Sequence, residues 1–183
     1  IVILILGLVV HFFAFPHIHR LYEDEPNYME SAKNMNQKAQ PLLCSYSYNG
    51  SEGCSFIQKP VGWPFLISIL FLFTGLSNYA PMYLNSFIGS LSIILIFLCS
   101  YLIFRDKNIA LWAAFLYAFT PLNIYWASTS GNNNVSVFFI LLTLALFLIY
   151  LNTKDKYILF ASILCFIFMF LVRFDNCIVG FML

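Results

Sequence analysis

Long apolar stretches, separated by short polar breaks, run along most of this chain. About 20 apolar residues are needed to cross the hydrocarbon core of a bilayer, so each long stretch is a candidate membrane-spanning helix. The first stretch is shorter and is interpreted as the end of a span. The pattern predicts an all-α membrane protein, a polytopic helical bundle of about five spans. These expected spans are residues 1–15, 82–104, 110–127, 135–151 and 157–178.

The longest polar break, residues 16–81, is an expected outer loop. Pro26 suits the first position of a helix, which places Glu25 at the cap and Asp24 just before it. The polar and apolar positions that follow predict a short amphipathic helix at the membrane interface, ending before the next proline. The apolar segment 61–76 is short and opens with glycine and proline, so we expect a re-entrant or tilted helix that does not cross.

Two short basic turns, at 105–107 and 154–156, are separated by two predicted spans and therefore share one side of the membrane. Short basic loops favour the cytoplasm. The loop around Asn132 and the acidic segment before Lys59 are then expected on the extracytoplasmic face. Counting 61–76 as a crossing helix would invert this assignment.

Composition agrees with a membrane protein, because 61% of the 183 residues are hydrophobic and only 9% are charged. Soluble domains carry about a quarter charged residues. With a formal net charge of +1 and no basic patch, no nucleic-acid partner is expected. The chain begins and stops inside apolar runs, so we expect a fragment cut at both ends.

The five cysteines fall into two groups. Cys99, Cys165 and Cys177 lie in apolar runs and are expected to be packing residues. Cys44 and Cys54 flank a polar loop and would pair in an oxidising compartment. Their spacing is equally compatible with two free thiols.

Three adjacent carboxylates, Glu23 to Glu25, follow the first apolar run. A carboxylate in a partly dry site can serve as a general base or hold a divalent cation beside a phosphate. An acidic residue that merely complements a helix dipole is an equally good interpretation. The basic residues Arg20 and Lys59 bracket this outer segment and would grip a phosphate or extend to lipid head groups.

Arg173 and Asp175 lie inside the last predicted span, where charges are costly and often functional. A structural contact with another helix is an equally good explanation. Residues two apart do not face each other on a helix, so no direct pair is expected. Asn132–Asn134 are expected to cap the next helix rather than to take part in catalysis.

Four short motifs occur in order along the chain. They are Asp24-Glu25-Pro26-Asn27-Tyr28, Lys59-Pro60-Val61-Gly62-Trp63-Pro64, the segment 84–91 and the segment 110–121. This order resembles the polytopic glycosyltransferases of the C-type fold, and in particular the protein O-mannosyltransferase and aminoarabinose transferase superfamily. The resemblance covers nearly the whole chain, which would be the N-terminal part of one transmembrane catalytic domain.

The resemblance implies transfer of a sugar from a polyprenyl-phosphate-linked donor to a protein, lipid or glycan acceptor on the extracytoplasmic face. Asp24 would be the general base, and Glu25 would support it or contact a cation. The residues assigned to the substrate or its phosphate are Arg20, Tyr28, Lys59 and Arg173. Several relatives carry an acid where this chain has Asn132–Asn134, so the metal and any divalent cofactor are left unassigned.

Two other classes of function fit the same residues. A transporter or flippase of lipid-linked sugars would use Arg173 and Asp175 in a translocation path. A non-enzymatic membrane scaffold would need none of these charges. Replacing Asp24 would stop an enzyme but not a transporter, which separates the first two classes.

Overall fold

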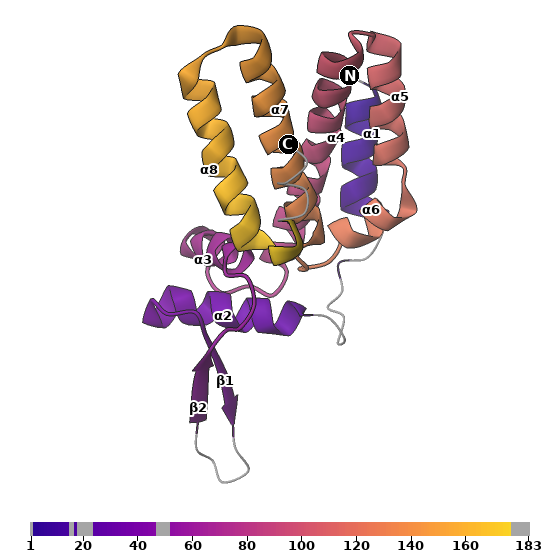
Figure 1. The fold of residues 1–183 in the computed structure, drawn as a ribbon. Coiled ribbons are helices and arrows are strands. Elements are labelled where there is room, and N and C mark those ends of the chain that lie inside the picture. Colours follow the sequence, from indigo (N-terminus) through magenta and orange to yellow (C-terminus); the bar gives the residue numbers. More distant parts are fainter. Residues whose placement is uncertain (1, 15–16, 18–23, 47–51, 177–183) are drawn as a thin grey trace.

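The computed structural model describes residues 2–14, 17, 24–46 and 52–176. Within these ranges the chain is almost entirely helical, with one β-hairpin and one short 3-10 helix (Figure 1). This confirms the all-α membrane class. The elements are α1 Val2–Phe13, α2 Glu25–Lys38, β1 Leu42–Tyr46, β2 Glu52–Phe56, α3 Gly62–Thr74, α4 Ala80–Phe104, α5 Lys107–Ala118, α6 Pro121–Ala127, α7 Asn133–Thr153, α8 Lys156–Val172 and η1 Phe174–Asn176.

Two helices in the described ranges, α4 and α7, are long and apolar enough to cross a membrane by themselves. The expected span 110–127 is divided into α5 and α6, which together meet the same criterion but bend by 59°. The bend precedes Pro121, which stands in the first turn of α6 and cannot continue the hydrogen bonding of α5. α3 and α8 are shorter apolar helices, so the count of five spans stays a prediction.

The last predicted span, 157–178, extends too far, because α8 ends at Val172. Arg173 adopts an extended backbone, with φ of −158° and ψ of 125°. Side-chain amides bind the carbonyl groups at this end. Asn132 Nδ2 donates to Val172 O at 2.9 Å, and Asn176 Nδ2 donates at 3.0 Å to Met169 O, which also accepts from the backbone N–H of Arg173. Arg173 therefore stands beyond the helix and not inside it.

The helices form a bundle with a second layer across one end (Figure 1). The α4–α5 and α7–α8 turns lie at one end, and α2, α3 and the hairpin lie at the other. α2 begins at Glu25 with Asp24 at its N-cap, one residue earlier than expected, and ends before Pro41 as predicted. α2 and α3 pack directly on each other.

One buried apolar cluster joins this end layer to the bundle. Its fully buried members include Ala32 of α2, Trp63 and Ile67 of α3, Val135 of α7 and Val172 of α8. Where α3 meets α8 there is room only for glycine, since a Cβ at Gly62 would lie 2.6 Å from the backbone carbon of Leu171. The packing thus brings the starts of α2, α3 and α7 to the end of α8.

The β-hairpin was not predicted by the hydrophobic pattern. Its two antiparallel strands place Cys44 directly opposite Cys54, and the two cysteines form a disulfide. Of the two alternatives that the spacing allowed, the structure has the paired one. Cys99 is buried and Cys165 half-buried, as expected of packing residues, while Cys177 lies outside the described residues.

Candidate active site

A cavity of about 250 Å³ opens where the start of α2, the segment after β2, the loop before α7 and the end of α8 meet. Its lining residues are Asp24, Tyr28, Lys59, Pro60, Gly131, Asn132, Asn133, Arg173, Phe174 and Asp175. Four of the six predicted site residues line it, namely Asp24, Tyr28, Lys59 and Arg173. Arg20 lies outside the described residues, and Glu25 is not part of the lining.

Asp24 and Lys59 form an ion pair at the cavity wall. Asp24 occupies the N-cap position of α2, yet its side chain makes no capping hydrogen bond to the helix. Its carboxylate is instead held by the Lys59 ammonium group, and its side chain remains 55% exposed. Asp24 is thus both accessible from the cavity and next to a cation.

Arg173 is held from two sides. Its Nη1 donates to Asn133 Oδ1 at 2.5 Å, and its Nε donates to Asp175 Oδ2 at 3.1 Å. The expectation that Arg173 and Asp175 do not meet is wrong, because it assumed a continuous α-helix through positions where the backbone is extended and then 3-10. A planar guanidinium with two fixed edges has a fixed direction, which suits recognition of an oxyanion.

Glu25 points away from the cavity and into the protein. It is fully buried, at 0% exposure, and its Oε2 accepts a hydrogen bond from Ser130 Oγ at 2.9 Å. A buried carboxylate is costly unless such partners stabilise it. Glu25 therefore connects the start of α2 to the loop before α7, and it does not line the cavity.

The loop before α7 is fixed by side chains from two other helices. Together with Asn133, the first residue of α7, it forms the segment 128–133, hereafter the polar loop. Trp63 Nε1 of α3 donates to Ser130 O at 2.6 Å. Asn85 Nδ2 of α4 lies 2.8 Å from Thr129 O and 3.2 Å from Gly131 O. The polar loop thus bonds to Glu25 through Ser130 and to Arg173 through Asn133.

Sequence reasoning missed the roles of Asn85, Trp63 and Asn133. The first two were present only as members of the quoted motifs, and a buried amide inside an apolar helix was the signal that could have identified Asn85. Asn132 does stand at the N-cap of α7, but it makes no capping bond to the helix. Its side chain bonds to the end of α8 instead.

The described part of the chain contains no group of three or more His, Cys, Asp or Glu side chains that could hold a metal ion. The two acids that line the cavity, Asp24 and Asp175, are each paired with a basic residue. These residues do not form a metal site, so no step of a mechanism is assigned to a metal.

The family of the chain follows from a comparison with known proteins. The family model described as dolichyl-phosphate-mannose-protein mannosyltransferase matches residues 58–183. The chain belongs to this family. It is therefore a membrane protein and a glycosyltransferase of the mannosyltransferase type. No curated protein and no solved structure matches the chain.

The match to the mannosyltransferase family divides the cavity in two. Lys59, the polar loop and Arg173 fall inside the matched segment, whereas Asp24 and Glu25 precede it. Both cations of the cavity, together with Asp175, thus lie in the part of the chain that defines the family. Asp24, at the N-cap of α2, precedes that part, and the fold places it beside them.

Proposed function

We propose that this cavity transfers a sugar from a polyprenyl-phosphate-linked donor to a protein, lipid or glycan acceptor. One observation carries the proposal: Asp24, Lys59 and Arg173, from three distant parts of the chain, line one cavity. An acid and two cations are the groups that such a transfer needs. The family description supports a phosphate-linked donor and a protein acceptor.

Asp24 is proposed as the general base. An acceptor hydroxyl that enters the cavity gives its proton to the Asp24 carboxylate as its oxygen attacks the anomeric carbon of the donor sugar. The bond from that carbon to the phosphate oxygen breaks, and polyprenyl phosphate leaves from the opposite face. The sugar is transferred with inversion. A positioned base of this kind contributes about 10²- to 10⁴-fold to a rate.

Lys59 and Arg173 are proposed to hold the donor phosphate. Negative charge builds on that phosphate as the sugar departs, and fixed cations in a shielded site stabilise the developing charge. The orientation of the Arg173 guanidinium is already fixed by its hydrogen bonds to Asn133 and Asp175. Lys59 has a flexible stem, and it exchanges its contact with Asp24 for the phosphate when the donor binds. Tyr28, buried beside Asp24, forms part of the cavity wall.

The cavity end of the bundle is proposed to face the extracytoplasmic side. The disulfide between Cys44 and Cys54 supports this, because disulfides persist in oxidising compartments. The basic turns at the opposite end support it too, since short basic loops favour the cytoplasm. With Arg173 and Asp175 located at the cavity rather than inside α8, the transporter hypothesis loses its starting observation.

The decisive test compares two aspartate-to-asparagine variants of the full-length protein in membranes. Asp24→Asn should lower transfer of mannose from a polyprenyl-phosphate donor by about 10²-fold or more, because the base is removed. Asp106→Asn is the matched control. Asp106 accepts hydrogen bonds from backbone N–H groups at the start of α5, and asparagine caps a helix equally well. If Asp24→Asn retains full transfer at wild-type expression, the proposal is wrong.

A further inference from the structure

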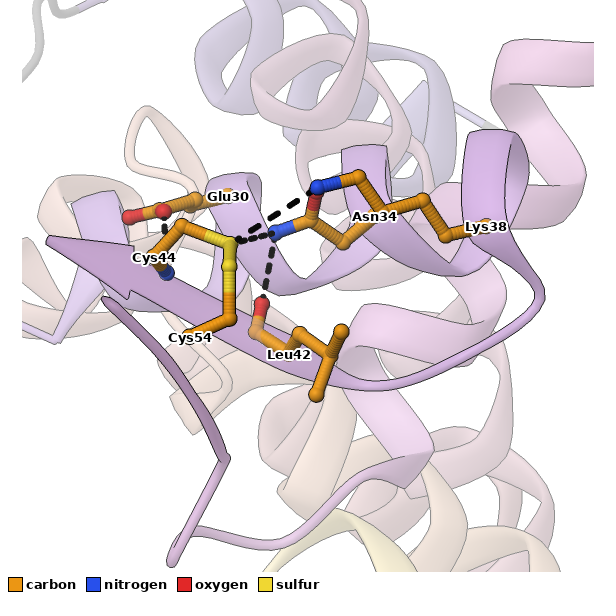
Figure 2. The surroundings of a disulfide bond; sticks show 6 residues. All are labelled: Glu30, Asn34, Lys38, Leu42, Cys44 and Cys54. Atoms are coloured by element: carbon orange, nitrogen blue, oxygen red, sulfur yellow. Dashed lines mark hydrogen bonds between the residues drawn. A yellow bond between two sulfur atoms is a disulfide. The ribbon is translucent and has the colours of Figure 1, made fainter. Parts of the chain in front are cut away.

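The outer edge of strand β1 is covered by α2. Cys44 N–H donates to Glu30 Oε1 at 2.6 Å, and Asn34 Nδ2 donates to Leu42 O at 2.8 Å (Figure 2). Both side chains come from the face of α2 on which the hairpin stands. An exposed strand edge is a ready template for another strand, and covering it with a helix is one way that proteins prevent such pairing.

Within the part of the chain that the structure describes, the outer edge of β2 has no such cover. Cys44 and Cys54 face each other with their Cα atoms 4.1 Å apart, the short separation of a non-hydrogen-bonded pair. Their backbone N–H and C=O groups therefore point outward, as do those of Phe56, two residues along the same strand. Among the described residues, no side chain or backbone group of another element bonds to the outward groups of Cys54 or Phe56.

After the charged Glu52 at its start, β2 contains no charged residue and no proline, the residues that usually block strand addition. Gly53, Cys54, Ser55 and Phe56 are all exposed, with Phe56 65% exposed. The disulfide ties β2 to β1, and α2 holds β1 in place. The edge is thus ordered before any partner arrives, which lowers the entropic cost of binding.

The edge leads directly to the cavity. Lys59, at the cavity wall, follows Phe56 by three residues, a distance of about 10 Å for an extended chain. A peptide strand that lies along β2 and continues in the direction of that strand reaches the cavity after a similar number of residues. The end of the β2 edge is thus within about 10 Å of the cavity wall.

We propose that the free edge of β2 binds the acceptor polypeptide as a third β-strand. This inference rests on the proposed function, since it requires a protein acceptor. Main-chain hydrogen bonds from Cys54 and Phe56 would supply the binding, so recognition tolerates many acceptor sequences but requires an extended, unfolded segment. A hydroxyl-bearing residue beyond the paired segment then enters the cavity beside Asp24.

The first test scans the acceptor. A synthetic peptide with one serine is prepared as a series, each member carrying a single backbone N-methyl group and unchanged side chains. Each outward hydrogen bond lost should raise the KM for the peptide about fivefold. The rise should recur at every second position, beginning roughly three residues from the serine, because strand pairing has a period of two. The kcat and the donor KM should stay at their values for the unmethylated peptide.

The second test changes the enzyme. Phe56→Pro removes the outward N–H of Phe56 while β2 keeps its pairing with β1, and prolines are tolerated at such edge positions. It should raise the peptide KM about fivefold and weaken the alternating pattern. Phe56→Ala is the matched control, because it removes the same aromatic ring but keeps the N–H. Retention of the disulfide and an unchanged donor KM verify that each variant is folded.

The outcomes separate the two proposals. The role of β2 is overturned if transfer occurs but the peptide KM does not alternate along the N-methyl series, or if Phe56→Pro and Phe56→Ala have equal KM values. Either result leaves the proposed function intact. A wild-type enzyme that consumes the donor but never transfers to any peptide overturns the polypeptide acceptor, and with it this inference. Strand addition is supported if the KM values alternate along the peptide series with the wild-type enzyme and with Phe56→Ala, but not with Phe56→Pro.

Discussion

The two ends of the helical bundle both carry charged residues, but they use them differently. At the turn end, Asp106 accepts from the N–H groups of Asn108 and Ile109, and Asp155 accepts from that of Tyr157. The turn end also has one contact between distant residues, from Arg105 to Asn152. At the cavity end, apart from the neighbouring pair Arg173 and Asp175, the bonded partners are far apart in sequence. Lys59 and Asp24 are separated by 35 residues, Arg173 and Asn133 by 40, and Ser130 and Glu25 by 105.

The difference shows what each set of charges does. The turn-end aspartates begin helices, and their contacts form as soon as the local backbone does. Asp24, Lys59 and Glu25 gain the contacts described above only when α2, the segment after β2 and the polar loop are assembled, and Arg173 reaches Asn133 only when the end of α8 joins them. Changes at the turn end should therefore alter stability alone, and changes at the cavity end should alter transfer.

The largest expected effect is in accessibility from outside the cell. Lys33→Cys, on the exposed face of α2, should react with an impermeant maleimide in intact cells, whereas Lys107→Cys, at the opposite turn, should react only after the membrane is opened. Labelling is measured as a mass shift on a gel, with the wild-type protein as background. The reverse pattern would place the cavity in the cytoplasm.

Removing a cation at the cavity end should lower transfer activity, whereas removing one at the turn end should not. Lys59→Gln and Arg173→Gln should each lower kcat/KM for the donor by about 10²- to 10³-fold, since an electrostatic stabiliser of the leaving phosphate is lost. Lys107→Gln and Lys156→Gln, exposed at the turn end, should stay near the wild-type value. Equal losses at both ends would show that net charge, and not the cavity, is responsible.

Glu25 should affect stability through its bond to Ser130. Glu25→Ala should lower the free energy of unfolding by about 1–3 kcal/mol, because the buried Ser130 hydroxyl loses its partner. Glu25→Gln, which keeps an acceptor oxygen, should lose less than half as much. Thermal unfolding in detergent measures both. If the two variants are equally unstable, the charge of Glu25 matters and the hydrogen bond does not.

The smallest expected effect is at the turn-end caps. Asp106→Ala and Asp155→Ala should each cost about 0.5–2 kcal/mol of stability, the usual value of an N-cap. Asparagine at either position should restore stability to within a few tenths of a kcal/mol. Transfer rates should not change at a temperature where each variant is folded, and a lower rate in either alanine variant would contradict the division between the ends.

Much of the fold could be predicted because it depends on neighbours along the chain. Apolar runs long enough to span a bilayer identify α4 and α7, and Pro26 identifies the start of α2. The same local reasoning failed where a distant group intervened. It extended the last helix through Arg173, and it did not predict the hairpin, whose β1 edge is satisfied by side chains of α2.

The amino-acid sequence was enough to assign the membrane class, most helix positions and the residue types available for chemistry, because the local periodicity of side chains and the chemistry of helix ends indicate them. Its motifs also indicated the family. Three-dimensional packing was needed to bring Asp24, Lys59 and Arg173 to one cavity, to bury Glu25 away from its lining, and to cover the β1 edge of the hairpin with α2. Contacts across 35 or more residues depend on how complementary surfaces pack, and no local pattern encodes that packing.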